Sequence, residues 1–248
     1  MFNLFNRHRK DAKLFYHTDV HCHILPGVDH GSQDVMQSLE MLRAEIDMGI
    51  DRVILTSHVT AETFENTPQS LTTAFETLKE AVAEAQLPVE LHVSAEYRID
   101  EYWDTQYAAG AILPMPGNYL LLENSFQQEL LELDELMFDL QLKGYKPILA
   151  HPERYEYYAR RHSRLTQLHN AGVKFQINIL SLANYFGPVA RETAEWLIKN
   201  EMVDMLGTDM HNLDHAHIIK DYIGSRDWRK LSAQLEPHII NDRVADKK

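Results

Sequence analysis

Short β-prone runs alternate with longer helix-like runs along most of this chain. Runs rich in apolar and β-branched residues predict strands, and the segments between them repeat apolar positions at helical spacing. We expect strands at Phe15–Val20, Arg52–Thr56, Val89–Ala95, Tyr119–Glu123, Lys146–Ala150, Lys174–Asn178 and Asp204–Gly207. We expect helices at Asp34–Met48, Ser70–Gln86, Glu101–Ala109, Glu129–Lys143, Arg161–Ala171 and Val189–Asn200.

This alternation is typical of an α/β fold in which helices cover a parallel sheet. Seven predicted strands favour a closed or nearly closed barrel, and an open doubly wound sheet is the alternative. Neither a Gly/Ser linker nor a shift in composition divides the chain, so we expect a single domain over residues 14–248. Residues 1–13 are basic and lack the continuous apolar run of a signal peptide, which predicts a short N-terminal arm.

Composition narrows the classes of function. The 248 residues carry a formal net charge of −13, which argues against general affinity for nucleic acid. The single cysteine excludes an internal disulfide framework and is typical of a reducing, cytoplasmic setting. Since no run of eighteen apolar residues occurs, we expect no membrane-spanning segment. The sequence leaves the oligomeric state open, homo-oligomers included.

Side chains that bind metals lie at or just after the ends of six of the seven predicted strands. In (β/α) barrels these carboxyl ends converge on one face, so residues distant in sequence would meet around one pocket. A lone histidine at such a position carries little weight, but a set this regular is hard to credit to chance. The set comprises His21, His23, Asp29, His30, His58, Glu96, Glu123, His151, Asp209 and His211.

Spacing within the set supports a metal site. His21 and His23, like Asp209 and His211, stand two residues apart, and such side chains point to the same side of an extended segment. Imidazole and carboxylate ligands without a thiolate cluster suit Mn²⁺, Fe²⁺, Zn²⁺ or Mg²⁺. Cys22 is not expected to be a phosphatase nucleophile, because Val28 stands six residues later where a phosphate-binding arginine would be needed.

At these residues the sequence resembles the polymerase and histidinol phosphatase (PHP) superfamily. Within it, the match is to the bacterial manganese-dependent tyrosine-protein phosphatases of capsule and exopolysaccharide systems. The matching stretches run in family order over nearly the whole chain after Lys13. They are DVHCHILPGVDHG at 19–31, TSH at 56–58, SAEY at 94–97, LLLEN at 120–124, LKGYKPILAHPERY at 142–155, FQINILSL at 175–182 and LGTDMHN at 206–212.

The resemblance implies a distorted (β/α)₇ TIM-like barrel with three divalent ions, Mn²⁺ being favoured. One ion would be held by His21, His23, Glu96 and Asp209, and Glu96 would bridge to a second ion held by Glu123 and His151. His30, His58 and His211 would hold the third. Arg154 would contact the substrate phosphate and act in catalysis with Asp209 and His211, and Tyr155 would contact the substrate. Tyr97, Tyr155 and Tyr185 are candidates to stack on a phenyl ring.

The function implied is hydrolysis of phosphotyrosine by a metal-bound hydroxide, on a protein such as a bacterial tyrosine kinase that controls exopolysaccharide or capsule synthesis. The alternatives are a small-molecule phosphatase such as a histidinol phosphatase, a nucleic-acid phosphoesterase, which the net charge disfavours, and an inactive regulatory domain. Two departures from the family keep the last alternative open. His30 stands where an aspartate is usual, and Asp214, His215 and His217 follow the final Asp-x-His without the arginine common there.

Overall fold

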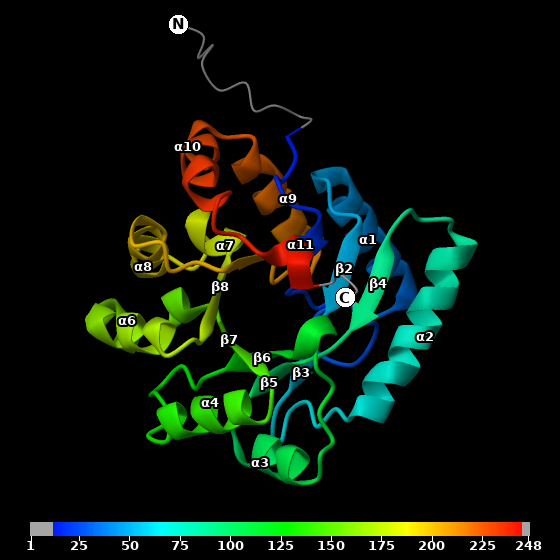
Figure 1. Cartoon of the computed structure of the whole chain (residues 1–248). Helices are drawn as coiled ribbons and strands as arrows, with labels where there is room; N and C mark the ends of the chain where they lie inside the picture. The colour runs from blue at the N-terminus through cyan, green and yellow to red at the C-terminus, as the bar shows by residue number, and fades with distance from the viewer. Residues whose placement is uncertain (1–11, 245–248) are drawn as a thin grey trace, which may run out of the picture.

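The computed structural model describes residues 12–244, so nearly all of the predicted N-terminal arm lies outside the described residues. Two parallel ladders form the sheet, one in the order β1-β2-β4 and the other in the order β3-β5-β6-β7-β8-β9 (Figure 1). The first holds β1 (Thr18–Asp19), β2 (Arg52–Leu55) and β4 (Glu90–Val93). The second holds β3 (His58–Val59), β5 (Glu96–Arg98), β6 (Tyr119–Glu123), β7 (Lys146–Ala150), β8 (Lys174–Asn178) and β9 (Met205–Gly207).

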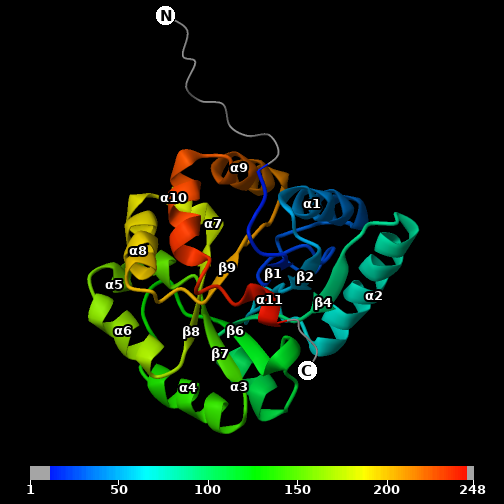
Figure 2. The same cartoon turned by 45° about the horizontal axis from the view of Figure 1, so that its top comes forward.

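Helices surround the sheet on its outer side, as the view in Figure 2 shows. The longer ones are α1 (Val35–Met48), α2 (Pro68–Glu84), α3 (Glu101–Ala108), α4 (Leu133–Leu142), α6 (His162–Asn170), α8 (Pro188–Lys199), α9 (Leu213–Ile223) and α10 (Arg226–Leu235). The short ones are α5 (Glu156–Ala159), α7 (Ile179–Leu182), α11 (Asn241–Val244) and the 3₁₀ turns η1 (Pro116–Asn118) and η2 (Pro152–Arg154). None of the helices between residues 12 and 244 is long and apolar enough to cross a membrane.

The second and third predicted strands are each followed, after a break, by a short further strand that the sequence did not predict. The second breaks between Leu55 and His58, and the third breaks between Val93 and Glu96. Both breaks fall at the same level, because Leu55 pairs with Val93 and His58 pairs with Glu96 in the same register. At the break the Glu96 N–H lies between two carbonyls, those of Thr56 and Ser57. His58 and Glu96 therefore begin short strands instead of following long ones.

Hydrogen bonds join the segments that follow β1 and β9, so the sheet curls and brings its first and last strands together. The Asp209 N–H donates to the His21 carbonyl at 2.8 Å, and the His23 N–H donates to the Met210 carbonyl at 3.0 Å. Cys22 and Met210 form a parallel bridge between the same segments. Two ligand candidates from opposite ends of the chain thereby become neighbours.

The strands divide the hydrophobic core into two layers, since alternate side chains of a strand point to opposite faces. On β6, Leu120 and Leu122 belong to the larger cluster, which the helices cover. Leu121 belongs to a smaller cluster inside the curled sheet, together with Ile54 and Ile148. Both clusters are almost free of solvent exposure, which is the burial that stabilises the fold.

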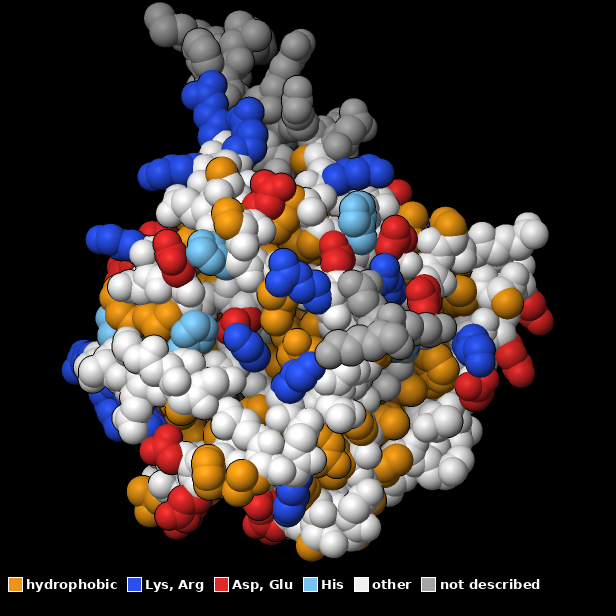
Figure 3. All heavy atoms as spheres, in the orientation of Figure 1, with side chains coloured by type: hydrophobic (Ala, Val, Ile, Leu, Met, Phe, Trp, Pro, Cys, Tyr) orange, Lys and Arg blue, Asp and Glu red, His pale blue; other side chains and the backbone are white. Residues whose placement is uncertain are grey.

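The C-terminal helices α9, α10 and α11 were not predicted. Asn241 in α11 fixes the amino end of the sheet, because its side-chain amide donates to the carbonyls of Thr18 and Leu206 and accepts from the Leu206 N–H. Val244 from the same short helix packs into the inner cluster. On the face that includes α11, Lys and Arg side chains gather near the middle with acidic and apolar groups among them (Figure 3).

A candidate metal centre at the carboxyl end of the sheet

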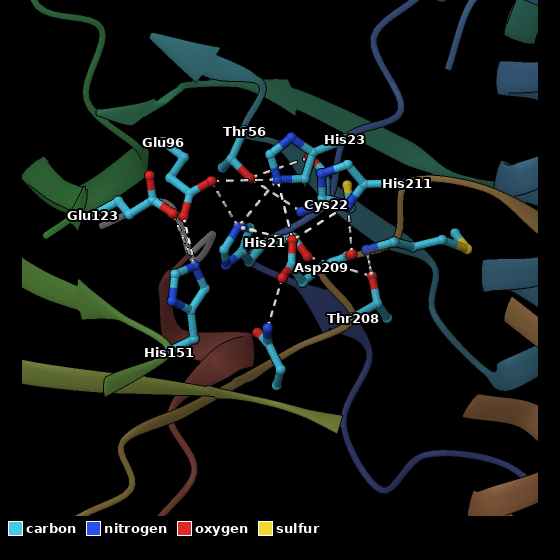
Figure 4. Close-up of polar contacts among 12 residues, drawn as sticks. His21, Cys22, His23, Thr56, Glu96, Glu123, His151, Thr208, Asp209 and His211 are labelled. Atoms are coloured by element: carbon cyan, nitrogen blue, oxygen red, sulfur yellow. Dashed lines mark hydrogen bonds and ion pairs between the residues drawn. The ribbon is translucent and has the colours of Figure 1, made fainter. Parts of the chain in front are cut away.

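The predicted ligands meet at the carboxyl end of the curled sheet. Figure 4 shows His21 and Asp209 in the middle of the group, with Glu96, Glu123 and His151 on one side and His23 and His211 on the other. Within residues 12–244, four sets of ligand atoms lie close enough to share a cation. They are His21 with His23 and Glu96, His21 with His151 and Asp209, His58 with Glu96 and Glu123, and His23 with His58 and His211.

Donor atoms converge most closely around His21 and His23. The two Nε2 atoms lie 3.3 Å apart, and each lies 3.4 Å from Glu96 Oε2. Asp209 Oδ1 lies 3.6 Å from His21 Nε2 and 3.3 Å from His23 Nε2. With metal–ligand bonds of about 2.0–2.2 Å, neighbouring donors of a tetrahedral site are separated by roughly 3.4 Å. These four side chains therefore fit one divalent cation.

Glu96 is shared among several imidazoles. His58 Nδ1 lies 3.0 Å from Glu96 Oε2, so three imidazole nitrogens approach this one oxygen. The oxygen is buried and makes no hydrogen bond among the described residues despite these close contacts. The other carboxylate oxygen of Glu96, Oε1, lies 2.9 Å from His151 Nε2, and that nitrogen is 3.7 Å from Glu123 Oε1. A carboxylate oxygen that three imidazole nitrogens approach without a hydrogen bond to it fits a ligand shared between cations, with Glu96 as the bridge.

His30 lies at the margin of the centre. Its side chain is exposed, and its ring centroid is 4.9 Å from that of His58 and 4.5 Å from that of His211. His58 and His211 lie close enough to share a cation with His23, but His30 belongs to none of the close sets within the described chain. Of the three histidines predicted to hold the third ion, His58 and His211 therefore lie close together, and His30 lies apart from them.

The carboxylates favour positive charge at His21, whereas burial lowers the pKa of His151 to about 4 and that of His211 to about 3. Burial opposes protonation of His21, but Glu96 and Asp209 raise its pKa to about 9. Burial opposes ionisation of Asp209, yet His21 and His23 hold its pKa well below the usual range. Burial and the charge of Glu96 raise the pKa of Glu123 to about 7. Where carboxylates are this close, protons or divalent cations must balance the charge.

Neighbouring polar side chains orient the histidines. Gln176 Oε1 lies 2.7 Å from His21 Nδ1, and Asp29 Oδ2 lies 2.9 Å from His23 Nδ1, so both Nε2 atoms face the centre. Asn178 Nδ2 donates to Asp209 Oδ2 at 2.6 Å. Such partners fix the tautomer and ring orientation of metal ligands. The sequence analysis gave Gln176 no role, although it lies two residues before the strand-end Asn178 and therefore on the same face.

The backbone at two predicted ligands is strained. His151 has φ 34° and Asp209 has φ 48°, which places both in the left-handed region that non-glycine residues rarely adopt. Glycine provides room nearby, because a Cβ on Gly207 would lie 2.7 Å from the His21 Cβ and 2.6 Å from Gln176 Nε2. The strand end is thus shaped around the imidazole of His21.

A cavity of about 530 Å³ opens over the centre, and two guanidinium groups line it. Arg154 Nη1 donates to Asp209 Oδ2 at 3.0 Å, and Arg98 Nη1 donates to Glu123 Oε2 at 3.3 Å. The sequence analysis named Arg154 and missed Arg98. A signal was present, because Arg98 lies two residues after Glu96 on one strand and so shares its face.

The tyrosines predicted to contact substrate are placed differently. Tyr155 is fully buried, and its hydroxyl accepts the Asn124 N–H at 2.9 Å, so it supports the cavity from beneath instead of lining it. Tyr97 is also buried and accepts the Leu113 N–H. Tyr185 is 48% exposed, and its hydroxyl lies 3.1 Å from His215 Nε2. Aromatic walls come from Phe64 and Phe126.

The environment of Cys22 does not suit a nucleophile. Its side chain is fully buried in the larger core cluster, and burial raises the pKa of the thiol well above its usual value. A thiol that is buried and protonated is a poor nucleophile.

Comparisons with known proteins show the family to which the chain belongs. The family model for capsular polysaccharide synthesis proteins of the CpsB/CapC type matches residues 17–218. The tyrosine-protein phosphatase YwqE of Bacillus subtilis is 32% identical over 196 residues, which cover 79% of this chain and 77% of the relative. The tyrosine-protein phosphatase CpsB of Streptococcus pneumoniae is 25% identical over 241 residues, or 91% of this chain and 99% of the relative.

Solved structures give the same relationship. The chain superimposes with a TM-score of 0.75 and 28% identity on a chain from the crystal structures of Bacillus subtilis YwqE and Streptococcus pneumoniae CpsB, described as unique metal-dependent tyrosine phosphatases. The match covers 93% of this chain and 99% of the solved one. This chain therefore belongs to the CpsB/CapC family of capsular polysaccharide synthesis proteins.

Proposed function

We propose that this chain is a metal-dependent phosphatase that hydrolyses phosphotyrosine in proteins. One observation carries the proposal: three imidazole nitrogens converge on Glu96 Oε2 beneath a cavity that two arginines line. The relatives described above are named tyrosine-protein phosphatases, which favours this substrate over histidinol phosphate. A convergent donor set also argues against an inactive regulatory domain.

The distances support the ligand assignment that we propose. His21, His23, Glu96 and Asp209 would hold one ion, and Glu96, Glu123 and His151 a second. A third would lie with His58 and His211, and His30 would join it by a change of side-chain rotamer. Mn²⁺ is the ion we favour, with Fe²⁺, Zn²⁺ and Mg²⁺ as alternatives.

We also propose that the fold is a distorted (β/α)₇ barrel in one domain over residues 14–248. Counting β2 with β3 and β4 with β5 gives seven strands, because each pair keeps one register across its break. The hydrogen bonds between residues 21–23 and 209–210 support closure. The buried, reduced Cys22 is consistent with the cytoplasmic location that we propose.

In the proposed mechanism, bound divalent cations supply an activated water and neutralise charge on the phosphate oxygens. The chain's own groups bind and orient the substrate. Arg154 keeps one N–H on Asp209, and the rest of its five donors remain for the phosphate. Arg98 approaches from the Glu123 side, so the two guanidinium groups would hold the phosphate between them. Tyrosinate, with a pKa near 10 when free, leaves readily.

The physiological substrate that we propose is a phosphorylated bacterial tyrosine kinase of a capsule or exopolysaccharide system. The net charge of −13 and the mixed charges of the surface shown in Figure 3 do not favour a nucleic-acid substrate.

The test uses protein purified without chelator, with bound metals measured by mass spectrometry. A phosphotyrosine peptide, its phosphoserine analogue and histidinol phosphate are then assayed with and without Mn²⁺. We expect metal-dependent turnover that favours phosphotyrosine, is abolished by EDTA and survives thiol alkylation. Asp209→Asn should abolish it. Asp204→Asn is the matched control, since Asp204 is a buried carboxylate that binds His169 and Lys174 away from the centre. Turnover of histidinol phosphate alone would overturn the substrate assignment.

A further inference from the structure

A second hollow of about 220 Å³ adjoins the cavity over the metal centre. The two share Phe126 and Arg154 in their walls, so the guanidinium group of Arg154 stands between them. The remaining wall of the second hollow comes from the apolar residues Phe186, Val189 and Ala190 and from two acidic residues, the buried Glu153 and the exposed Glu156. The hollow therefore continues the phosphate-binding cavity with a wall that combines three apolar side chains and two carboxyl groups.

Aromatic rings fix Arg154 at this boundary. The guanidinium carbon lies 4.0 Å from the ring centroid of Phe186 and 5.0 Å from that of Phe126. Cation–π contacts of this kind hold a planar cation in one orientation. A phosphate bound to Arg154 would thus lie directly beside the second hollow.

Two apolar side chains in the wall of the second hollow are exposed to solvent. Val189 is 45% exposed in the first turn of α8, and Phe126 is 36% exposed in the loop after β6. Gly187, with φ 90°, turns the chain between α7 and α8 so that Phe186 and Val189 both reach the hollow. Exposed apolar side chains that line a concavity next to a functional site are typical of binding surfaces.

The opposite wall of the large cavity has a different character. Glu62, Asp100 and Glu101 line it there, so that side presents negative charge. Ala61 and Phe64 also line the large cavity, so apolar contact there is combined with these acidic side chains. Successive residues of an extended peptide advance about 3.3 Å, so a side chain within two positions of the phosphotyrosine can reach the hollow.

We propose that this hollow is a subsite for an aliphatic side chain, such as leucine or valine, within two residues of the phosphotyrosine in a protein substrate. The inference rests on the proposed function and adds which residues beside the phosphotyrosine the site prefers. Glu156 at the edge and the acidic opposite wall would disfavour acidic residues flanking the phosphotyrosine.

The test compares phosphotyrosine peptides in a Gly/Ser background that carry one leucine at position −2, −1, +1 or +2. With the Mn²⁺-loaded protein, we expect kcat/KM to rise about tenfold for at least one position over the all-Gly/Ser peptide. Val189→Ser should reduce that preference to about twofold or less, because it removes part of the exposed wall, while turnover of p-nitrophenyl phosphate stays unchanged. Leu142→Ser, at a 70% exposed leucine on α4, is the matched control and should keep the full preference.

A binding arm separates this inference from the proposed function. The same peptides are made with a non-hydrolysable phosphonomethyl-phenylalanine and titrated by fluorescence anisotropy. Tighter binding of a leucine peptide that Val189→Ser abolishes supports the subsite, even if no peptide is turned over, and absent turnover would count against the phosphatase alone. Equal binding of all the peptides, or a leucine preference that survives in Val189→Ser, would overturn the subsite.

Discussion

The two ends of the curled sheet are built from the same strands but carry opposite kinds of side chain. Inside the sheet towards its amino end, Ile54, Leu121, Ile148 and Met205 form a cluster with 0% exposure. At the carboxyl end, equally buried positions carry the imidazoles and carboxylates of the metal centre, among them His21, His23 and Glu96. Burial is therefore similar at both ends, and the chemistry of what is buried differs.

This difference separates stability from function. Apolar burial stabilises the fold by about 25 cal/mol for each Å² removed from water. Buried ionisable groups cost free energy unless partners or cations balance them, and left-handed residues such as His151 and Asp209 add strain. The amino end thus supports a carboxyl end that is costly to fold but suited to binding cations and phosphate. Substitutions at the amino end should therefore change mainly the stability, and substitutions at the carboxyl end should change mainly the activity.

Glu96→Gln should have the largest effect on activity. Glu96 contacts His21, His23, His58 and His151, so its loss weakens every part of the centre. Orienting partners of metal ligands typically contribute 10–100-fold, and we expect a bridging ligand to contribute more, on the order of 10³-fold in kcat. Steady-state kinetics and metal content by mass spectrometry measure this. Full activity with normal metal content would remove Glu96 from the centre.

Ile148→Ala should affect stability instead. Ile148 is fully buried in the inner cluster, and truncation leaves a cavity that costs about 2–5 kcal/mol of unfolding free energy. Urea denaturation measures the loss, while kcat per folded molecule should stay within about twofold. A large fall in kcat at full stability would show that the two ends are not separable in this way.

Arg154→Lys should lower kcat by about 10²-fold with little change in stability. Lysine keeps the charge but loses the planar fork that can bind Asp209 and phosphate together, and it stacks less well between Phe126 and Phe186. Arg161→Lys is the control, since Arg161 is exposed and its ion pair with Glu129 is long, at 3.9 Å. Equal kinetics for the two variants would contradict a phosphate-binding role for Arg154.

Much of this arrangement could be predicted from the sequence, because strand ends and period-two spacing follow from local rules. Alternation of strand and helix indicated the parallel α/β fold, and β6, β7 and β8 have the predicted bounds. His21 and His23 were expected to face the same side, and their Nε2 atoms are 3.3 Å apart. Signals of this kind need only the neighbouring residues.

The rest depended on contacts between distant segments. The breaks before His58 and Glu96 arise from how two strands pair, which neither run of residues reveals alone. The burial of Tyr155 results from its packing under the loop at Asn124. The apolar wall beside Arg154 combines Phe126 and Phe186, sixty residues apart in the chain. Only the folded topology brings such pairs together.

The dependence of stability on pH should show the smallest effect and should distinguish the metal-free from the metal-loaded protein. In protein treated with EDTA, the pKa of His21 is raised from 6.5 to about 9, because Glu96 and Asp209 outweigh the effect of burial. A raised pKa means that the folded state binds the extra proton. Its contribution is therefore complete below pH 6.5 and is lost as pH rises through about 9.

Unfolding free energies of the EDTA-treated protein should thus fall by roughly 1–2 kcal/mol between pH 6.5 and 9. Mn²⁺ should abolish or reverse this fall, because cations bind the deprotonated imidazoles and replace the protons as balancing charge. In His21→Gln without metal, the fall should shrink, since the amide does not titrate. Identical pH profiles with and without Mn²⁺ would mean that His21 does not exchange protons for a cation, and the carboxyl end would then be a buried ionic network that resembles a metal centre only in outline.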